Sequence, residues 1–334
     1  MPDQEENKAL QVLDGLRSFM ESRVVFTAVE LGIFDLIERS SSAPMAQNIA
    51  SELHTDLRAT MRLLDCLVAL GFLNKTDKGE YQLNERGSYL TSSHPYSVLP
   101  MVQHQSFLWK NWSHLTDAVR HGFNPYREGV MSSPESKRAF IQAMHVIART
   151  LAKDIVAGYD ASWAKKLLDI GCASGTYAVA FLSVYPTMKA VLFDLPDVIP
   201  FAEERIEKAG LSDRVSFIAG DFYTDELPEG CDLVFLSAII HQNSPQENID
   251  LFKKVFRALE PGGRILIRDH VMSEDRIWPP AGTLFALNML VVTPAGDTYT
   301  FSELSEFLKE AGFENVRLVR SGHKMDCLVE AHKL

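Results

Sequence analysis

Residues 167–176 read Leu167-Leu168-Asp169-Ile170-Gly171-Cys172-Ala173-Ser174-Gly175-Thr176, an apolar run that ends in a glycine-bearing turn. A second apolar run ends in Asp194, 19 residues after Gly175. A strand, a glycine turn, a helix and a second strand ending in a carboxylate are typical of an adenosine site at the carboxyl edge of a parallel sheet. The sequence therefore predicts a site for an adenosine-containing cofactor.

The residues of the turn indicate which cofactor is bound. Dinucleotide enzymes use three glycines so that a helix N-terminus can approach a pyrophosphate, whereas this turn has Ala173 at the middle position and Asp169 just before it. A carboxylate at that place repels a pyrophosphate and suits an ammonium group. We therefore expect S-adenosyl-L-methionine, with Asp169 supporting its amino-acid end, rather than NAD. Glycine turns after strands also occur without any ligand, so the turn alone is a moderate signal.

The pattern of apolar residues changes once along the chain. Up to about residue 155 apolar residues recur at helical spacing, whereas from residue 166 onward short apolar strands alternate with helices. This order predicts an α/β fold, in which a Rossmann-like doubly wound domain follows a mostly helical domain. We expect the strands at residues 166–171, 189–194, 215–220, 231–238, 263–269, 315–321 and 326–332, the last two as an antiparallel hairpin at one edge of the sheet.

The first half contains a pattern that is often used to bind DNA. Residues 45–73 predict two short helices and residues 78–83 a turn and a strand, which is the order of a winged helix. The second helix, at residues 58–67, carries two arginines but lacks the surrounding basic cluster that phosphate contacts need. The apolar helical surface instead indicates a subunit interface, so we expect a homodimer.

Composition excludes several classes of protein. The 334 residues are 46% apolar and 23% charged, which indicates a globular protein of two domains. The net charge of −11 disfavours nucleic acid as a partner, because it repels a phosphate backbone. Residues 1–7 are acidic and no apolar run approaches about 18 residues, so we expect no signal peptide, no membrane span and a cytoplasmic location.

The cysteines do not suggest a metal site or disulfides. Cys66, Cys172, Cys231 and Cys327 are scattered and form no C-x-x-C pair. This spacing is typical of buried free thiols in a reducing compartment. We expect no structural metal.

Five motifs follow one another in the order of a known family. They are Asp169-Ile170-Gly171, Phe193-Asp194-Leu195-Pro196, Gly220-Asp221-Phe222-Tyr223, His241 after the fourth strand, and Pro261-Gly262-Gly263-Arg264. With them the chain resembles, over nearly its whole length, the two-domain S-adenosylmethionine-dependent O-methyltransferases of the plant caffeate and acetylserotonin type and their bacterial relatives. The resemblance implies a winged-helix dimerisation domain at residues 1–100, a helical linker at 101–155 that contributes to the cleft, and a Rossmann-like catalytic domain at 156–334.

The predicted cofactor-binding residues lie at strand ends. A strand-end carboxylate can accept hydrogen bonds from both ribose hydroxyls, and the adenine amino group and ring suit a second carboxylate and an aromatic ring. The resemblance adds a position four residues before the histidine, beside the sulfonium. The residues are Asp169 at the amino-acid end, Gly171 and Gly175 in the turn, Asp194 and Leu195 at the ribose, Asp221 and Phe222 at the adenine, and Ser237 at the sulfonium.

His241 is the candidate catalytic base. A phenol attacks a methyl sulfonium much faster once its proton is removed, and a histidine can take that proton near neutral pH. The family pattern differs here, because Thr298 stands where the resemblance places a supporting carboxylate. We hypothesise that Asp297, one residue away, replaces that carboxylate, and we regard Asp269 and His270 as further polar candidates.

The predicted acceptor-binding residues come from two helices. The resemblance places Phe140, Met144 and His145 beside the methyl group and the acceptor, and three residues on a later helix, Asn288, Met289 and Val292, are expected to line the opposite wall. The expected activity is methyl transfer to a hydroxyl of a small aromatic or quinonoid molecule. The altered carboxylate leaves two alternatives, a nitrogen or carbon acceptor (or another activity with this cofactor) and a non-enzymatic winged-helix regulator that senses the cofactor.

Overall fold

The computed structural model describes residues 4–334, with side chains at residue 8, at 10–13 and from 15 onward. Residues 1–3 of the acidic start noted above lie outside this part. The chain divides into two compact units, which are Met1–Trp109 with Ser133–Val146 and Lys110–Ser132 with Ile147–Leu334. Two helices pass from one unit to the other, α6 (Leu99–Ser113) and α8 (Pro134–Ala157).

The first unit contains the predicted winged-helix order. Asp56 caps the second helix of the motif, because its carboxylate accepts a hydrogen bond of 2.8 Å from the amide of Ala59. A small core of Ile49, Leu64 and Tyr81 joins the two helices to the wing. The elements are α1 (Gln4–Glu30), α2 (Ile33–Arg39), α3 (Ala46–Leu53), α4 (Leu57–Ala69), the antiparallel strands β1 (Leu73–Lys75) and β2 (Tyr81–Leu83), and α5 (Glu85–Ser88).

Helix α1 presents large apolar side chains to solvent within this unit. About half or more of the surface of each is exposed, for Leu10, Val12, Leu13, Leu16, Phe19 and Met20. An apolar surface of this extent on one helix is typical of a protein–protein contact.

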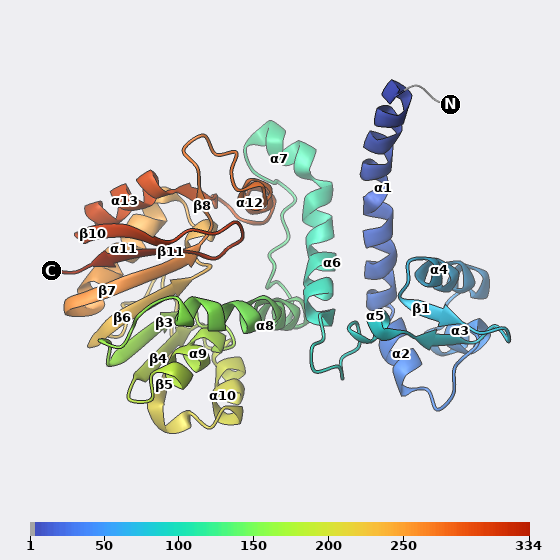
Figure 1. Ribbon diagram of the computed structural model, residues 1–334, viewed down its shortest axis with the longest axis horizontal. Coiled ribbons are helices and arrows are strands. Elements are labelled where there is room, and N and C mark those ends of the chain that lie inside the picture. Colours follow the sequence, from blue (N-terminus) through green and yellow to red (C-terminus); the bar gives the residue numbers. More distant parts are fainter. Residues whose placement is uncertain (1–3) are drawn as a thin grey trace. The chain divides into compact units, whose positions relative to one another are not determined.

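The second unit is built on a seven-stranded sheet with the order β10-β11-β7-β6-β3-β4-β5 (Figure 1). The five strands from β7 to β5 are parallel, and β10 and β11 form an antiparallel hairpin at the edge, as predicted. The strands are β3 (Lys166–Ile170), β4 (Lys189–Asp194), β5 (Val215–Ala219), β6 (Cys231–Ser237), β7 (Leu259–Asp269), β10 (Glu314–Arg320) and β11 (Cys327–His332), with a small separate pair of β8 (Val271–Met272) and β9 (Tyr299–Thr300).

Both faces of the sheet are covered by helices, which is why its strands are almost wholly apolar. Leu167, Phe235 and Leu266 face the cluster under α8, α9 and α10, while Leu168 and Val234 face the cluster under α11 and α13. The helices of this unit are α7 (Leu115–His121), α9 (Thr176–Val184), α10 (Ile199–Lys208), α11 (Pro245–Ala258), α12 (Pro280–Val292) and α13 (Phe301–Glu310), with short 3₁₀ turns at Ser212–Arg214 and Ile240–Gln242.

All four cysteines are free, in agreement with the sequence prediction. Cys172, Cys231 and Cys327 are buried, but Cys66 is half-buried, because it lies on α4 beside the partly exposed side of that helix. Among the described helices, none is both long enough and apolar enough to span a membrane.

Candidate functional site

The turn after β3 has a backbone that favours glycine. Gly171 and Gly175 have φ values of +66° and +69°, in the left-handed region. A Cβ atom on Gly171 would lie 2.5 Å from Cδ1 of Ile239, in the loop after β6. The turn therefore packs closely against the loop after β6, the strand beside β3 in the sheet.

Asp194 holds this turn from the end of β4. Its carboxylate accepts hydrogen bonds from the amide of Ala173 at 2.7 Å and from the amide of Leu195 at 2.8 Å. Burial raises the pKa of Asp194, and the two amide donors oppose that rise. A carboxylate has about four acceptor positions, so two remain for the hydroxyls of a ribose. This arrangement fits the predicted role of Asp194 and Leu195 at the ribose.

Asp169 ends β3 just before the turn and is only 2% exposed. Burial, together with the nearby charge of Asp194, raises its pKa to about 8. Burial disfavours the ionised form of this carboxyl group, so a cationic partner would stabilise that form strongly. The site therefore fits the ammonium group of S-adenosyl-L-methionine and opposes a pyrophosphate.

Asp221 and Phe222 follow β5 at the same edge of the sheet. Asp221 accepts a hydrogen bond of 2.9 Å from the amide of Tyr223, which closes a local turn. Phe222 is half-buried against the cluster under α11 and α13, and its ring lies 4.5 Å from that of Tyr223. Their contacts with adenine stay a prediction.

His241 lies in the short turn after β6, where its ring faces a carboxylate from the next strand. The Nδ1 atom is 2.9 and 3.0 Å from the two carboxylate oxygens of Asp269, which is 2% exposed. Burial would raise the pKa of Asp269, but the facing His241 and the charge of Arg268 lower it below its ordinary value. An ionised Asp269 holds the proton on Nδ1 and leaves Nε2 as the basic nitrogen.

An aromatic ring lies against this pair. Phe285 on α12 meets the His241 ring edge-on, at 4.8 Å between ring centres and 89° between planes. The same ring lies 5.2 Å from that of His270. His241 therefore sits beside an apolar wall that suits a flat organic molecule.

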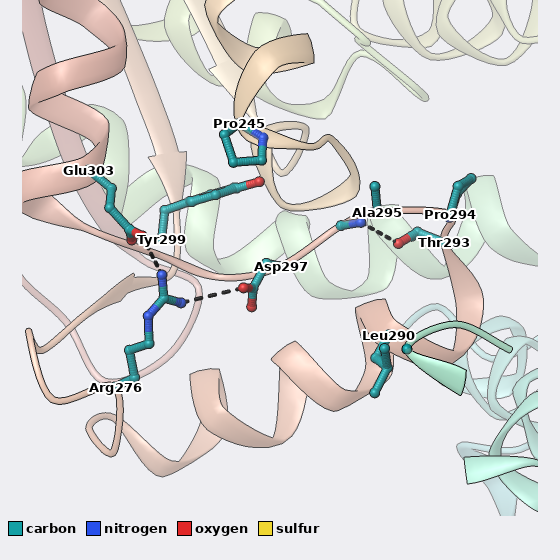
Figure 2. A pocket seen from close by; sticks show the side chains of 11 residues that line it. Pro245, Arg276, Leu290, Thr293, Pro294, Ala295, Asp297, Tyr299 and Glu303 are labelled. Atoms are coloured by element: carbon teal, nitrogen blue, oxygen red, sulfur yellow. Dashed lines mark hydrogen bonds and ion pairs between the residues drawn. The ribbon is translucent and has the colours of Figure 1, made fainter. Parts of the chain in front are cut away.

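The structure corrects the hypothesis about Asp297, because the carboxylate that pairs with His241 is that of Asp269. The carboxylate of Asp297 pairs with Arg276 at 3.4 Å and lines a hollow of about 220 Å³, with Glu303 on the other side of the guanidinium (Figure 2). Thr298 is buried, and its hydrogen bonds are made by its backbone, to Arg276 and to Asp297. The supporting carboxylate is Asp269, which sequence reasoning held only as a secondary candidate.

The loop with Asp297 still shapes the site through its backbone. A Cβ atom on Gly296 would lie 2.3 Å from the carbonyl oxygen of His241, so only glycine allows the two segments to approach this closely. The hydroxyl of Tyr299 donates a hydrogen bond to the carbonyl of Asn243 in the same loop. Residues 296–299 therefore fix the backbone that carries His241.

The predicted acceptor residues fall into two groups. On α12, Met289 and Val292 are buried, while Asn288 accepts a hydrogen bond of 2.8 Å from the indole of Trp112. Phe140, Met144 and His145 are half-buried on the part of α8 that belongs to the first unit. Their contacts with an acceptor stay predictions. Within residues 4–334, no group of three or more histidine, cysteine or acidic side chains is placed to hold a metal ion.

Comparison with known proteins agrees with this site. Residues 112–314 match the family described as the O-methyltransferase domain, and residues 13–93 match the O-methyltransferase dimerisation domain. The chain is 34% identical to acetylserotonin O-methyltransferase of Gallus gallus, over 93% of this chain and 94% of that protein. It is 29% identical to the tetracenomycin polyketide synthesis 8-O-methyl transferase of Streptomyces glaucescens, over 92% and 91%.

Solved structures lead to the same group. Human N-acetylserotonin methyltransferase in complex with S-adenosylmethionine is 29% identical, covers 100% of this chain and 99% of its own, and has a TM-score of 0.84. The strand-end carboxylates, the glycine turn and these matches agree in cofactor and fold. The chain therefore belongs to the S-adenosylmethionine-dependent O-methyltransferases, with a dimerisation domain followed by a Rossmann-like catalytic domain.

Proposed function

We propose that this enzyme methylates a hydroxyl group of a small aromatic or quinonoid molecule, with His241 as the general base. The observation that carries the proposal is the contact of 2.9 Å between His241 and the buried carboxylate of Asp269. Relatives named for acetylserotonin and for a tetracenomycin polyketide support this class of acceptor.

In this proposal some residues of the site hold the cofactor, and His241 with Asp269 removes the proton of the acceptor hydroxyl. When bound, S-adenosyl-L-methionine supplies an electrophilic methyl group and leaves as S-adenosylhomocysteine. Asp169, Asp194 and Asp221 would hold its ammonium, ribose and adenine, respectively, and Ser237 would lie on the side of its sulfonium. His241 accepts the proton of the acceptor hydroxyl at Nε2, while Asp269 stabilises the imidazolium that forms.

A positioned base of this kind contributes about 10²–10⁴-fold to the rate. The rest of the acceleration comes from orientation of the two reactants. Phe285 and the side chains of α12, Asn288, Met289 and Val292, would bind the flat acceptor, together with Phe140, Met144 and His145 of α8.

Asp269 removes the main reason for preferring a nitrogen or carbon acceptor. That alternative rested on a missing carboxylate beside His241, and Asp269 supplies one. A neutral amine needs no strong base, so a buried carboxylate–histidine pair would serve no purpose for it.

We also propose that two copies of the chain associate through the first unit. Residues 13–93 match a dimerisation domain, and the exposed apolar side chains of α1 offer the surface. A Leu16→Glu substitution should convert the dimer to a monomer in analytical ultracentrifugation. Gln11→Glu, at an exposed polar position of the same helix, adds the same charge and should leave the dimer intact.

The test of the function is release of S-adenosylhomocysteine with a panel of phenols, hydroxyquinones and aromatic amines. Wild type and His241→Ala are assayed side by side at saturating cofactor. We expect turnover with a hydroxyl acceptor and a loss of about a hundredfold or more in the variant. Turnover that is unchanged in His241→Ala, or confined to amines, would reject the proposed role of His241.

A further inference from the structure

A buried carboxyl group and a buried guanidinium lie on the same face of the sheet, and no ion pair joins them. Asp169 is 2% exposed and Arg268, on β7, is 4% exposed. Asp169 and Arg268 each lie two residues beyond an apolar residue of the α8–α10 face, Leu167 and Leu266, so both point to that face. A buried charge without a counter-charge is strongly unfavourable unless a ligand supplies one.

Arg268 has unused hydrogen-bond donors. Its Nε donates to the hydroxyl of Ser237 at 2.8 Å and its Nη1 donates to the carbonyl of Met325 at 2.7 Å. A guanidinium has five N–H donors, so three are left. Among the residues that the structure describes, no carboxylate forms an ion pair with it.

A second donor beside it is also unused. The hydroxyl of Tyr177, on α9, is buried and has no hydrogen-bond partner within the described part of the chain. The guanidinium of Arg268 lies 5.2 Å from the centre of this ring. Burial raises the pKa of the phenol, and the charges of Arg268 and Asp169 act on it in opposite directions.

Strand register brings these groups to the cofactor turn. Ile170 pairs with Leu236, and Ser237 pairs with Arg268, so Gly171, Ser237 and Arg268 lie at one level of the carboxyl edge. The hydroxyl of Ser237 accepts from Arg268 and keeps its own proton to donate. Ser237, Arg268 and the ring of Tyr177, 5.2 Å from the guanidinium, are therefore close to one another at the carboxyl edge that carries the glycine turn.

We propose that Arg268, Tyr177 and Ser237 bind the α-carboxylate of S-adenosyl-L-methionine, while Asp169 binds its ammonium group. The amino-acid end of this cofactor carries both charges on one carbon, as the pair of buried charges requires. The proposal rests on the use of S-adenosyl-L-methionine and not on the acceptor or on the role of His241.

The chemistry of the niche favours a carboxylate over other anions. One guanidinium with two hydroxyls matches the two oxygens of a monoanion. A phosphate dianion would place a second negative charge near Asp169, which is buried on the same face. A carboxylate on the methyl acceptor has the same chemistry as that of the cofactor, so the test must separate the two sources.

The experiment compares two ligands that differ only in the carboxylate, S-adenosylhomocysteine and its decarboxylated analogue, by isothermal titration calorimetry. Arg268→Met should weaken binding of S-adenosylhomocysteine about 10- to 100-fold, the usual effect of hydrogen bonds to a charged group. Binding of the analogue should change by no more than about threefold. Arg264→Met is the control for the loss of an arginine from this face of β7, because Arg264 also stacks on an aromatic ring, 4.2 Å from the centre of Trp163, at the other end of the strand. It also removes an ion pair with Glu330, so it controls for a loss of stability as well.

Tyr177→Phe guards against a folding defect in the arginine variant. It removes one oxygen and keeps the ring, and we expect it to weaken S-adenosylhomocysteine about 3- to 10-fold without affecting the analogue. Equal losses for both ligands, or no loss for either, would overturn the proposal. So would unchanged binding of S-adenosylhomocysteine with a raised KM for acceptors that carry a carboxylate.

Discussion

The contact between His241 and Asp269 leads to a prediction that distinguishes Asp269 from Asp297, the other carboxylate considered as a partner of His241. Asp269 is 2% exposed and lies 2.9 Å from Nδ1, whereas Asp297 is bound to Arg276. In Asp269→Asn, the amide keeps the shape of the side chain but carries no charge. It no longer stabilises the imidazolium, and its NH₂ group can hold Nδ1 as an acceptor, which moves the proton to Nε2 and abolishes the base.

The size of the effect follows from the geometry. Because the contact is buried and charge-assisted, its loss acts on the whole contribution of the base, about 10²–10⁴-fold in kcat. Binding of S-adenosylhomocysteine should change little, because Asp269 points to the α11–α13 face and Asp169 to the other. The thermal midpoint and the calorimetric Kd of the variant serve as folding controls.

The assay is the initial rate of S-adenosylhomocysteine release at saturating cofactor and acceptor, from pH 6 to 9. Asp297→Asn is the matched control and should stay within about threefold of wild type, because its carboxylate does not touch the imidazole. Similar losses in both variants, or a fully active Asp269→Asn, would refute the assignment of Asp269 as the residue that positions His241.

Three further predictions concern stability, backbone fit and protons. Burial would raise the pKa of Glu330, but hydrogen bonds from four neighbours lower it to about 2, so its stabilising effect is complete above pH 4.5 and lost as pH falls toward 2. Glu330→Gln should lower the free energy of unfolding at pH 7 by about 3 kcal/mol in urea titrations and flatten that acid dependence; an unchanged midpoint would contradict this. Gly296→Ala should lower kcat at least about tenfold with little change in cofactor Kd, because its Cβ would lie 2.3 Å from the carbonyl of His241; a fully active variant would show that the loop can yield. Since the pKa of Asp169 is about 8, binding of an ammonium at pH 7 should release up to about one proton, seen as a buffer-dependent binding enthalpy that Asp169→Asn abolishes.

The sequence was sufficient for the sheet and the cofactor because both depend on local patterns. Continuous apolar runs bounded by turns gave the strands to within a few residues, and the glycine turn with Asp194 specified the cofactor. The largest difference in strand length is in β7, which begins at Leu259 rather than at 263, because Leu259 pairs with Cys231 ahead of the main register.

The partner of His241 could not be predicted from spacing, because it depends on which way a strand end faces. Asp269 and Asp297 are both acidic residues near the carboxyl edge. The sequence favoured Asp297 as the replacement for the supporting carboxylate. Alternation along β7 turns Asp269 toward His241, whereas the loop with Asp297 contributes a glycine backbone and directs the acid to Arg276. A signal was present, since a carboxylate that directly ends a buried strand beside the strand of the base is more constrained than one in a loop.

Strand β7 contributes one residue to the proposed cofactor site and the next residue to the His241 pair, because its side chains alternate between the two faces of the sheet. Successive side chains of a strand point to opposite faces, so Arg268 and Asp269 must serve different faces of the sheet. One carries a positive charge to the cofactor side and the other a negative charge to the base. The charge of Arg268 also helps to lower the pKa of Asp269. Loss of Arg268 would therefore affect His241 only through the electrostatic effect on Asp269, whereas in our proposal it removes direct contacts with the cofactor. Arg268→Met should therefore raise the KM for S-adenosyl-L-methionine far more than it lowers kcat, and the opposite division is expected of Asp269→Asn. A change mainly in KM at Arg268 and mainly in kcat at Asp269 would support this division of roles between two adjacent residues.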